Sequence, residues 1–216
     1  MALIAGVDDS GRGPVIGPMV LAGVSLEEHK LEELQKLGVK DSKLLSKKQR
    51  EELFDKILDL VAAYKILVIS PQEIDDALGS DSLNLNWLEA VKFAEIINVL
   101  KPRRAIVDCP SPNIPAYTDY LRKHLSVPVF LQCEHKADTN HYIVGAASIL
   151  AKVTRDKEIE ILQKKYGDLG SGYPSDPLTQ KFIQENWQKH PEIFRKSWAP
   201  YQELVKRSQQ KQLEEY

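Results

Sequence analysis

Four aspartates stand where the sequence pattern changes from one expected element to the next. Asp8 and Asp9 end the first apolar run of the chain, Asp108 ends a later one, and Asp138 directly precedes a long helical pattern. Carboxylates that end strands of an open α/β sheet gather at one edge of that sheet. Clustered carboxylates repel one another unless divalent cations neutralise them, and oxygen-only ligands suit Mg²⁺ or Mn²⁺ rather than zinc. The pattern therefore indicates phosphodiester chemistry at two ions about 3.5–4 Å apart.

A plainer interpretation stays open, because a single aspartate most often caps a turn or a helix. Adjacent side chains on a strand also point to opposite faces of the sheet. Asp8 and Asp9 share one site only if the chain bends there, and the glycine turn that follows them makes such a bend reasonable.

Two glycine-rich loops carry further candidates. Gly11, Arg12 and Gly13 lack the spacing of the Walker and dinucleotide motifs. Their glycines allow the backbone to approach a ligand, and Arg12 suits a phosphate, whereas an ordinary hairpin turn is the alternative. Tyr173 lies in the second loop, where its ring either stacks on a sugar or base or serves the fold. Lys43 belongs to a charged cluster that either binds phosphate or forms a solvated loop, and the solvated loop is favoured.

The elements that must position these residues follow from apolar periodicity and turn signals. The expected strands are residues 3–7, 15–24, 66–69, 105–107 and 127–131. The expected helices are residues 30–37, 46–64, 85–100 and 142–162, with one more starting near Ser70. Early strands followed by alternating helices and strands predict an α/β fold with a mixed sheet.

Composition excludes several classes of protein. The 216 residues are 43% hydrophobic and 28% charged with a formal net charge of -2, which is typical of a globular domain. Cys109 and Cys133 are the only cysteines, so a disulfide scaffold is excluded. No apolar stretch approaches the roughly 20 residues that span a membrane, and the N-terminus lacks a basic leader. We expect an intracellular, cytoplasmic protein.

Six motifs in a fixed order carry a family resemblance. They read GVDDSGRGPVIGP, KDSK, IVDCP, EHKAD, AASILAK and GSGYPSDP. The chain to about Trp198 resembles type 2 ribonuclease H, most closely its archaeal branch. The resemblance implies the ribonuclease H-like fold, a mixed five-stranded sheet flanked by helices with a helical C-terminal portion. It also implies an endoribonuclease that hydrolyses the RNA strand of RNA–DNA hybrids and cuts at single ribonucleotides in duplex DNA, leaving a 3′-hydroxyl and a 5′-phosphate.

The same resemblance assigns roles to particular residues. The turn 11–13 would read a 2′-hydroxyl through its backbone, and Tyr173 would sense the junction between RNA and DNA. Asp9 departs from the family, whose second acid is normally glutamate, so metal affinity and rate at this position become open questions. The implied ligands of Mg²⁺ or Mn²⁺ are Asp8, Asp9, Asp108 and Asp138. The further expected substrate contacts are Lys43, Lys136, Ser148, Lys152 and Arg155.

The C-terminal end adds a candidate partner. We expect residues 1–205 to form the catalytic domain of a monomer, followed by a polar tail at 206–216. Gln210, Leu213 and Tyr216 resemble the short motif by which replication proteins dock on the sliding clamp. Such a segment folds on binding and places its apolar side chains in a pocket. An inert solvated tail is the alternative.

Two other classes of protein compete with a nuclease. Sugar kinases and actin-like proteins also end their first strand in an aspartate followed by glycines, but they need two related domains, and this chain shows no internal repeat. The other alternative, a hybrid-binding protein that has lost cleavage, depends entirely on Asp9 standing where the family normally has glutamate. A nuclease assay with Mg²⁺ and with Mn²⁺ separates these classes.

Overall fold

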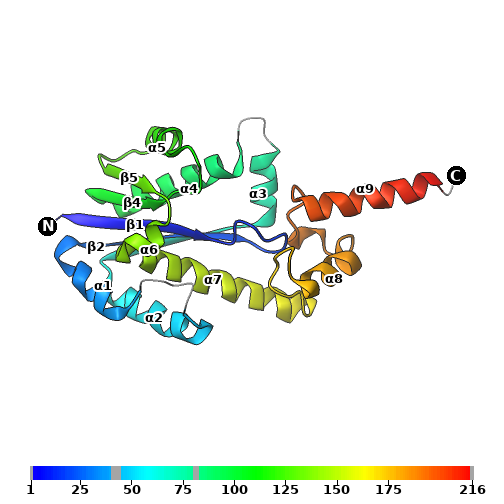
Figure 1. Ribbon diagram of the computed structural model, residues 1–216, viewed down its shortest axis with the longest axis horizontal. Coiled ribbons are helices and arrows are strands. Elements are labelled where there is room, and N and C mark those ends of the chain that lie inside the picture. The colour runs from blue at the N-terminus through cyan, green and yellow to red at the C-terminus, as the bar shows by residue number, and fades with distance from the viewer. Residues whose placement is uncertain (1, 40–44, 80–82, 215–216) are drawn as a thin grey trace.

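A computed structural model describes residues 2–39, 45–79 and 83–214 of the chain. Its centre is a five-stranded mixed sheet in the order β3-β2-β1-β4-β5 (Figure 1). The two pairs β1·β2 and β2·β3 are antiparallel, whereas β1·β4 and β4·β5 are parallel. The carboxyl ends of β1, β4 and β5 therefore meet at one edge of the sheet. The strands are β1 Leu3–Ser10, β2 Met19–Glu27, β3 Ala63–Ile69, β4 Arg104–Asp108 and β5 Phe130–Glu134.

Helices cover both faces of this sheet (Figure 1). The helices α1, α2 and α7 pack on one face around one apolar cluster, and α3, α4 and α5 pack on the other around a second. The bounds on the first face are α1 Leu31–Leu37, α2 Lys47–Leu60 and α7 Tyr142–Tyr166. Those on the second are α3 Pro71–Leu78, α4 Leu85–Leu100 and α5 Ile114–Lys123. The short α6 Ala137–Asn140 precedes α7, and η1 Glu28–Lys30 precedes α1.

Helix α7 lies directly against β1 because small residues remove the side chains between them. A Cβ atom on Gly6 of β1 would lie 2.5 Å from the backbone carbonyl carbon of Ile143, which no real contact allows. The first half of α7 is buried and contains the run Ala146-Ala147-Ser148. This close approach places the middle of α7 beside the end of β1, where Asp8 and Asp9 stand.

The C-terminal portion forms a third apolar cluster at one end of the sheet (Figure 1). Val15 and Ile16 from the segment between β1 and β2 belong to this cluster. Its elements are α8 Pro177–Asn186, η2 Pro191–Ile193 and α9 Ala199–Glu214. Helix α9 continues without a break across the expected boundary between residues 205 and 206. In the described part of the chain, no helix has the length and apolar character needed to cross a membrane.

Several expected boundaries are wrong, and three of them have a clear physical cause. The second strand begins at Met19 rather than residue 15, because the Val15 N–H donates to the Gly172 carbonyl at 2.8 Å instead of to a neighbouring strand. The second helix ends at Leu60, since residues 63–69 pair with β2. The last strand spans 130–134 instead of 127–131, and Pro128 in the earlier range has no N–H to donate.

Candidate active site

A cleft at the carboxyl ends of β1 and β4 brings the four predicted aspartates together. Asp8 and Asp9 come from β1, Asp108 from β4 and Asp138 from α6. The cleft also contains the three residues of the turn 11–13 and Tyr173 of the second glycine-rich loop. Its lining residues are Asp8, Asp9, Ser10, Gly11, Arg12, Gly13, Asp108, Asp138, Lys152 and Tyr173.

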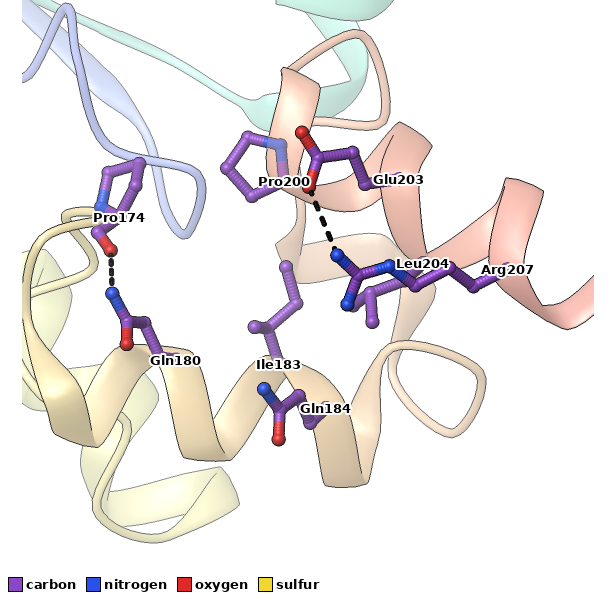
Figure 2. A pocket seen from close by; sticks show the side chains of 8 residues that line it. All are labelled: Pro174, Gln180, Ile183, Gln184, Pro200, Glu203, Leu204 and Arg207. Atoms are coloured by element: carbon purple, nitrogen blue, oxygen red, sulfur yellow. Dashed lines mark hydrogen bonds and ion pairs between the residues drawn. The ribbon is translucent and has the colours of Figure 1, made fainter.

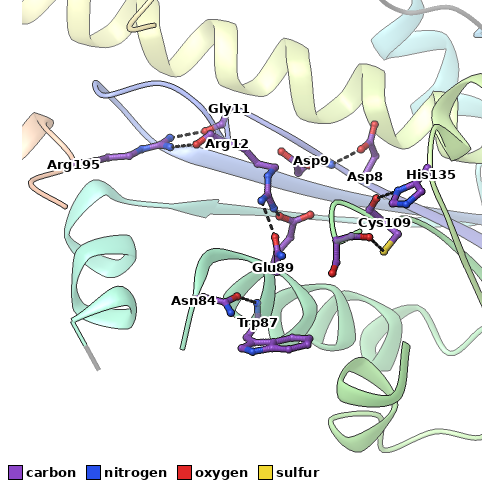
Figure 3. Close-up of polar contacts among 12 residues, drawn as sticks. Asp8, Asp9, Gly11, Arg12, Asn84, Trp87, Glu89, Cys109, His135 and Arg195 are labelled. Carbon is purple, nitrogen blue, oxygen red and sulfur yellow. Dashed lines mark hydrogen bonds and ion pairs between the residues drawn. The ribbon is translucent and has the colours of Figure 1, made fainter. Parts of the chain in front are cut away.

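Asp8 and Asp9 are neighbours at the cleft (Figure 3), where the pKa of each carboxyl is raised. Asp8 is buried, and one of its carboxylate oxygens accepts the Asp9 N–H at 2.8 Å. Burial and then the charge of Asp9 raise the pKa of Asp8 well above its usual range. Burial also raises the pKa of Asp9 to about 6, and Asp108 adds to this effect. The strand stays paired through Ser10, so the bend expected at Asp8 and Asp9 is absent, although both residues line the cleft.

Asp108 and Asp138 are linked through the start of α6. The Asp108 carboxylate accepts the Ala137 N–H at 2.7 Å, which fixes the helix turn that carries Asp138. Asp138 is buried and accepts the Thr139 hydroxyl at 3.2 Å. Lys136, just before this turn, is exposed and has a left-handed backbone with φ of 57°.

The donor chemistry of the cleft fits a hard divalent cation. In the residues that the structure describes, no three His, Cys, Asp or Glu side chains already surround one point as a metal cage. The four carboxylates of the cleft supply only oxygen donors, and the mutual repulsion of Asp8, Asp9 and Asp108 is what a bound cation relieves. All four aspartates are therefore suited to hold Mg²⁺ or Mn²⁺.

The Arg12 side chain in the turn after β1 is held by protein partners, and its charge lowers the pKa of Asp9. Arg12 turns toward α4, where its guanidinium pairs with Glu89 and donates to the Asn86 side-chain oxygen at 2.8 Å (Figure 3). Because Glu89 is completely buried, this ion pair holds the Arg12 guanidinium against α4. A phosphate contact by this guanidinium is therefore not favoured, and the expected contact through the backbone of the turn stays a prediction.

Arg155 packs against the loop that carries Tyr173. It is buried, donates to the Ser171 carbonyl at 2.8 Å, and its guanidinium carbon lies 5.0 Å from the centre of the Tyr173 ring. Burial lowers the pKa of Arg155. A Cβ on Gly11, whose φ is 89°, would lie 2.7 Å from the Arg155 Cδ atom, so the turn and this side chain are in tight contact. Tyr173 itself is 39% exposed and lines the cleft.

The remaining expected substrate contacts occupy different environments. Lys152 lines the cleft, donates to the Ser148 hydroxyl and lowers the pKa of both Asp8 and Asp9 through its charge. Ser148 is completely buried and donates to Asp8, which suits it to orient that carboxylate rather than to touch substrate. Lys43 lies outside the described residues.

A separate hollow lies behind the tyrosine loop, between α8 and α9 (Figure 2). It has no cluster of acids among its lining residues. Gln180 donates to the Pro174 carbonyl at 2.7 Å, so α8 holds the residue that follows Tyr173. Its lining residues are Pro174, Gln180, Ile183, Gln184, Pro200, Glu203, Leu204 and Arg207.

Two residues that contact the turn after β1 have little or no signal in the sequence. Glu89 occupies an otherwise apolar face of α4, and an acid in such a position is the one clue that it has a buried partner. Arg195 lies 178 residues beyond Gly17, to whose carbonyl it donates, so only the folded chain shows this contact.

Comparison with known proteins decides the family. The sequence model described as Ribonuclease HII matches residues 5–201. The chain belongs to the Ribonuclease HII family. It is 46% identical over 211 residues to the Ribonuclease HII of Thermococcus sibiricus, covering 95% of this chain and 92% of the relative. Family membership makes the protein a metal-dependent endoribonuclease that acts on RNA–DNA hybrids.

Solved structures agree with the fold. The crystal structure of the ribonuclease H2 from Pyrococcus horikoshii OT3 superposes with a TM-score of 0.88 at 41% identity, covering 95% of this chain and 98% of that one. The Ribonuclease HII in a complex with PCNA from Archaeoglobus fulgidus gives a TM-score of 0.83 at 40% identity, covering 91% and 95%. The expected ribonuclease H-like fold and family are confirmed.

Proposed function

We propose that the protein also cuts at single ribonucleotides embedded in duplex DNA, with two divalent cations held by Asp8, Asp9, Asp108 and Asp138. The observation that carries this proposal is the shared cleft, in which these four carboxylates lie beside the backbone of the glycine turn and the Tyr173 ring. Carboxylates alone suit any phosphodiester. The turn and the ring add contacts with a sugar and a base, and the 2′-hydroxyl is the group that separates RNA from DNA.

The residues of the cleft have different roles in this reaction. Bound divalent cations supply charge for the attacking and leaving oxygens of a phosphodiester. The four aspartates hold the cations, and Ser148 orients Asp8 by donating a hydrogen bond to it. Lys152 brings a positive charge to the wall of the cleft, where it favours binding of a phosphate. The exposed face of Tyr173 stacks on the sugar or base beside the reacting bond.

Three duplexes test this function in Mg²⁺ and in Mn²⁺. They are a continuous RNA–DNA hybrid, a DNA duplex with one ribonucleotide, and the same duplex without it. We expect cleavage of the first two, with 3′-hydroxyl and 5′-phosphate ends, and no cleavage of the third. Asp108→Asn should remove nearly all cleavage while the thermal unfolding midpoint is kept or raised, because the change relieves repulsion. Full Mg²⁺-dependent activity in that variant would contradict the assignment of Asp108.

We also propose that the C-terminal end binds a sliding clamp through Gln210, Leu213 and Tyr216. Support comes from the spacing of these residues and from the related Ribonuclease HII that was solved in a complex with PCNA. Gln210 and Leu213 lie in the last turns of α9, which extends away from the body of the protein (Figure 1), and Tyr216 lies outside the described residues. A clamp bound at this end of α9 would stay clear of the cleft. Deleting residues 210–216 should leave cleavage of a short duplex unchanged while abolishing clamp binding in a calorimetric titration. Clamp binding that survives the deletion would contradict this proposal.

A further inference from the structure

We propose that Arg195 is a positioning residue that sets the backbone of the Gly11–Gly13 turn for reading the substrate. This inference rests on the proposed function of the cleft. Arg195 does not line the cleft, and its side-chain hydrogen bonds reach the main chain of the loop that contains the turn. Its charge also lowers the pKa of Asp9.

One guanidinium holds three carbonyl groups at once, and Figure 3 shows two of these contacts, with Gly11 and Arg12. The Arg195 side chain donates to Gly11 at 2.7 Å and to Arg12 at 2.9 Å through its two terminal nitrogens. Its Nε donates to the Gly17 carbonyl at 3.0 Å. The planar, forked guanidinium suits this arrangement, because it presents several donors in fixed directions. Both ends of the loop between β1 and β2 are therefore fixed by one side chain.

Trp198 contacts the remaining carbonyl of the turn. Its indole Nε1 donates to the Gly13 carbonyl at 3.2 Å, and its ring centre lies 4.9 Å from the Arg195 guanidinium carbon. All three carbonyls of the turn therefore face side chains from the C-terminal portion. Arg195 is completely buried, and burial with the nearby charge of Arg155 lowers its pKa to about 9.

The direction of the carbonyls dictates the direction of the amides. Every peptide bond in the described residues is trans, so a carbonyl and the following N–H point to opposite sides of one plane. With the Gly11 and Arg12 carbonyls turned toward Arg195, the N–H groups of Arg12 and Gly13 point away from it. These two amides are donors for a sugar hydroxyl at the cleft, which the turn lines.

The segment that carries Arg195 is itself fixed from two sides. The Arg195 N–H donates to the Val15 carbonyl at 2.9 Å. On the other side, the Asp75 carboxylate of α3 accepts the Lys196 N–H at 2.7 Å and the Ser197 hydroxyl at 2.6 Å. A side chain held this firmly transmits its position to the turn. The C-terminal portion thus positions the backbone of the turn that contacts the ribose.

The test compares Arg195→Ala and Arg195→Lys with Arg122→Ala. Arg122 is an exposed arginine on α5 that pairs with Asp119, so its loss is a matched control away from the cleft. Hydrogen exchange of the amides in residues 10–18 reports the order of the turn without any substrate. Single-turnover cleavage of the duplex with one ribonucleotide reports function, and calorimetric titration with Mn²⁺ reports the metal site.

We expect Arg195→Ala to lose amide protection in residues 10–18 and to cut about 100-fold more slowly, because a small misplacement of a positioning group costs this much. The affinity for Mn²⁺ should not fall by more than about twofold, since the four aspartates are left intact and a positive charge near Asp9 is removed. Added ethylguanidinium should restore part of the cleavage rate. Arg195→Lys keeps the charge but cannot reach three carbonyls, so an intermediate rate is expected.

Normal amide protection in both variants, or cleavage within about threefold of the wild type, would overturn the proposal. Equal loss of Mn²⁺ affinity and cleavage would also overturn it, because the residue would then serve the whole site. If Arg195→Ala fails to fold in a thermal melt, Arg195→Lys decides between these outcomes. If the wild type does not cut but the variant still loses protection at the turn, the proposed function fails while the positioning role stands.

Discussion

Replacing Asp9 by asparagine should stabilise the metal-free protein. The pKa of Asp9 is raised from an ordinary value of 3.8 to about 6 in the folded chain, mainly by burial. The folded state therefore binds this proton more tightly than the unfolded state, so stability falls as the pH rises from about 4 to about 6. Above that range the ionised carboxylate costs on the order of 3 kcal/mol, because each tenfold change in a proton-binding constant corresponds to about 1.4 kcal/mol.

Asparagine has nearly the same shape and no charge, so Asp9→Asn should recover about 3 kcal/mol at pH 7.5 in EDTA. For a chain of this length that gain raises the unfolding midpoint by about 6–12 °C. The gap between variant and wild type should shrink to well under about 1 kcal/mol at pH 4 and vanish below about pH 3, where the aspartate is protonated in both states. It should also shrink when Mg²⁺ is added, because ligand binding to the folded wild type alone adds stability by mass action.

Urea unfolding of both proteins at pH 7.5 and pH 4, with EDTA and with Mg²⁺, measures these gaps. Asp55→Asn in α2 is a suitable control, since this exposed aspartate lies outside the cleft. A variant that is less stable than the wild type in EDTA at pH 7.5 would refute the reasoning. So would a gap that is the same at both pH values, because it would then have no electrostatic origin.

Two other predictions concern rate and selectivity. Asp9→Glu should raise activity or lower the Mg²⁺ concentration required, since glutamate restores the reach of the usual family acid; a loss of activity would mean that the site has adapted to aspartate. Tyr173→Ala should depress cutting at a single ribonucleotide more than cutting of continuous hybrid, whereas Tyr173→Phe, which keeps the ring, should retain most of both. Equal losses on the two substrates for Tyr173→Ala would remove the role of the ring in selectivity.

The sequence predicts most elements because each has a local signal. Ser46 and Ser70 start helices as expected, and both form capping boxes with the residue three positions later. The errors arise where distant segments compete for the same backbone groups. Residues 15–17 look like a strand, yet they pair with the C-terminal portion, and nothing near them in the sequence indicates that partner.

The same distinction holds for the active site. The aspartates at the ends of β1 and β4 are predicted to converge because parallel strands bring their carboxyl ends to one edge. The roles of Arg12 and Arg155 are harder to predict, since an arginine suits a phosphate and a buried carbonyl or carboxylate equally well. The structure shows both arginines turned to protein partners. Arg195 has no local pattern at all, and its contacts exist only after the C-terminal portion packs on the turn.

The most direct test of the metal site replaces one non-bridging oxygen of the reacting phosphate by sulfur in a duplex with one ribonucleotide. If the aspartates hold cations against this phosphate, one of the two sulfur isomers should slow cleavage in Mg²⁺ by more than about tenfold, because Mg²⁺ binds sulfur poorly. Mn²⁺ should restore much of the rate for that isomer and leave the oxygen substrate little changed. Equal rates for all three substrates in Mg²⁺, or a loss that Mn²⁺ does not reduce, would contradict metal contact with the phosphate.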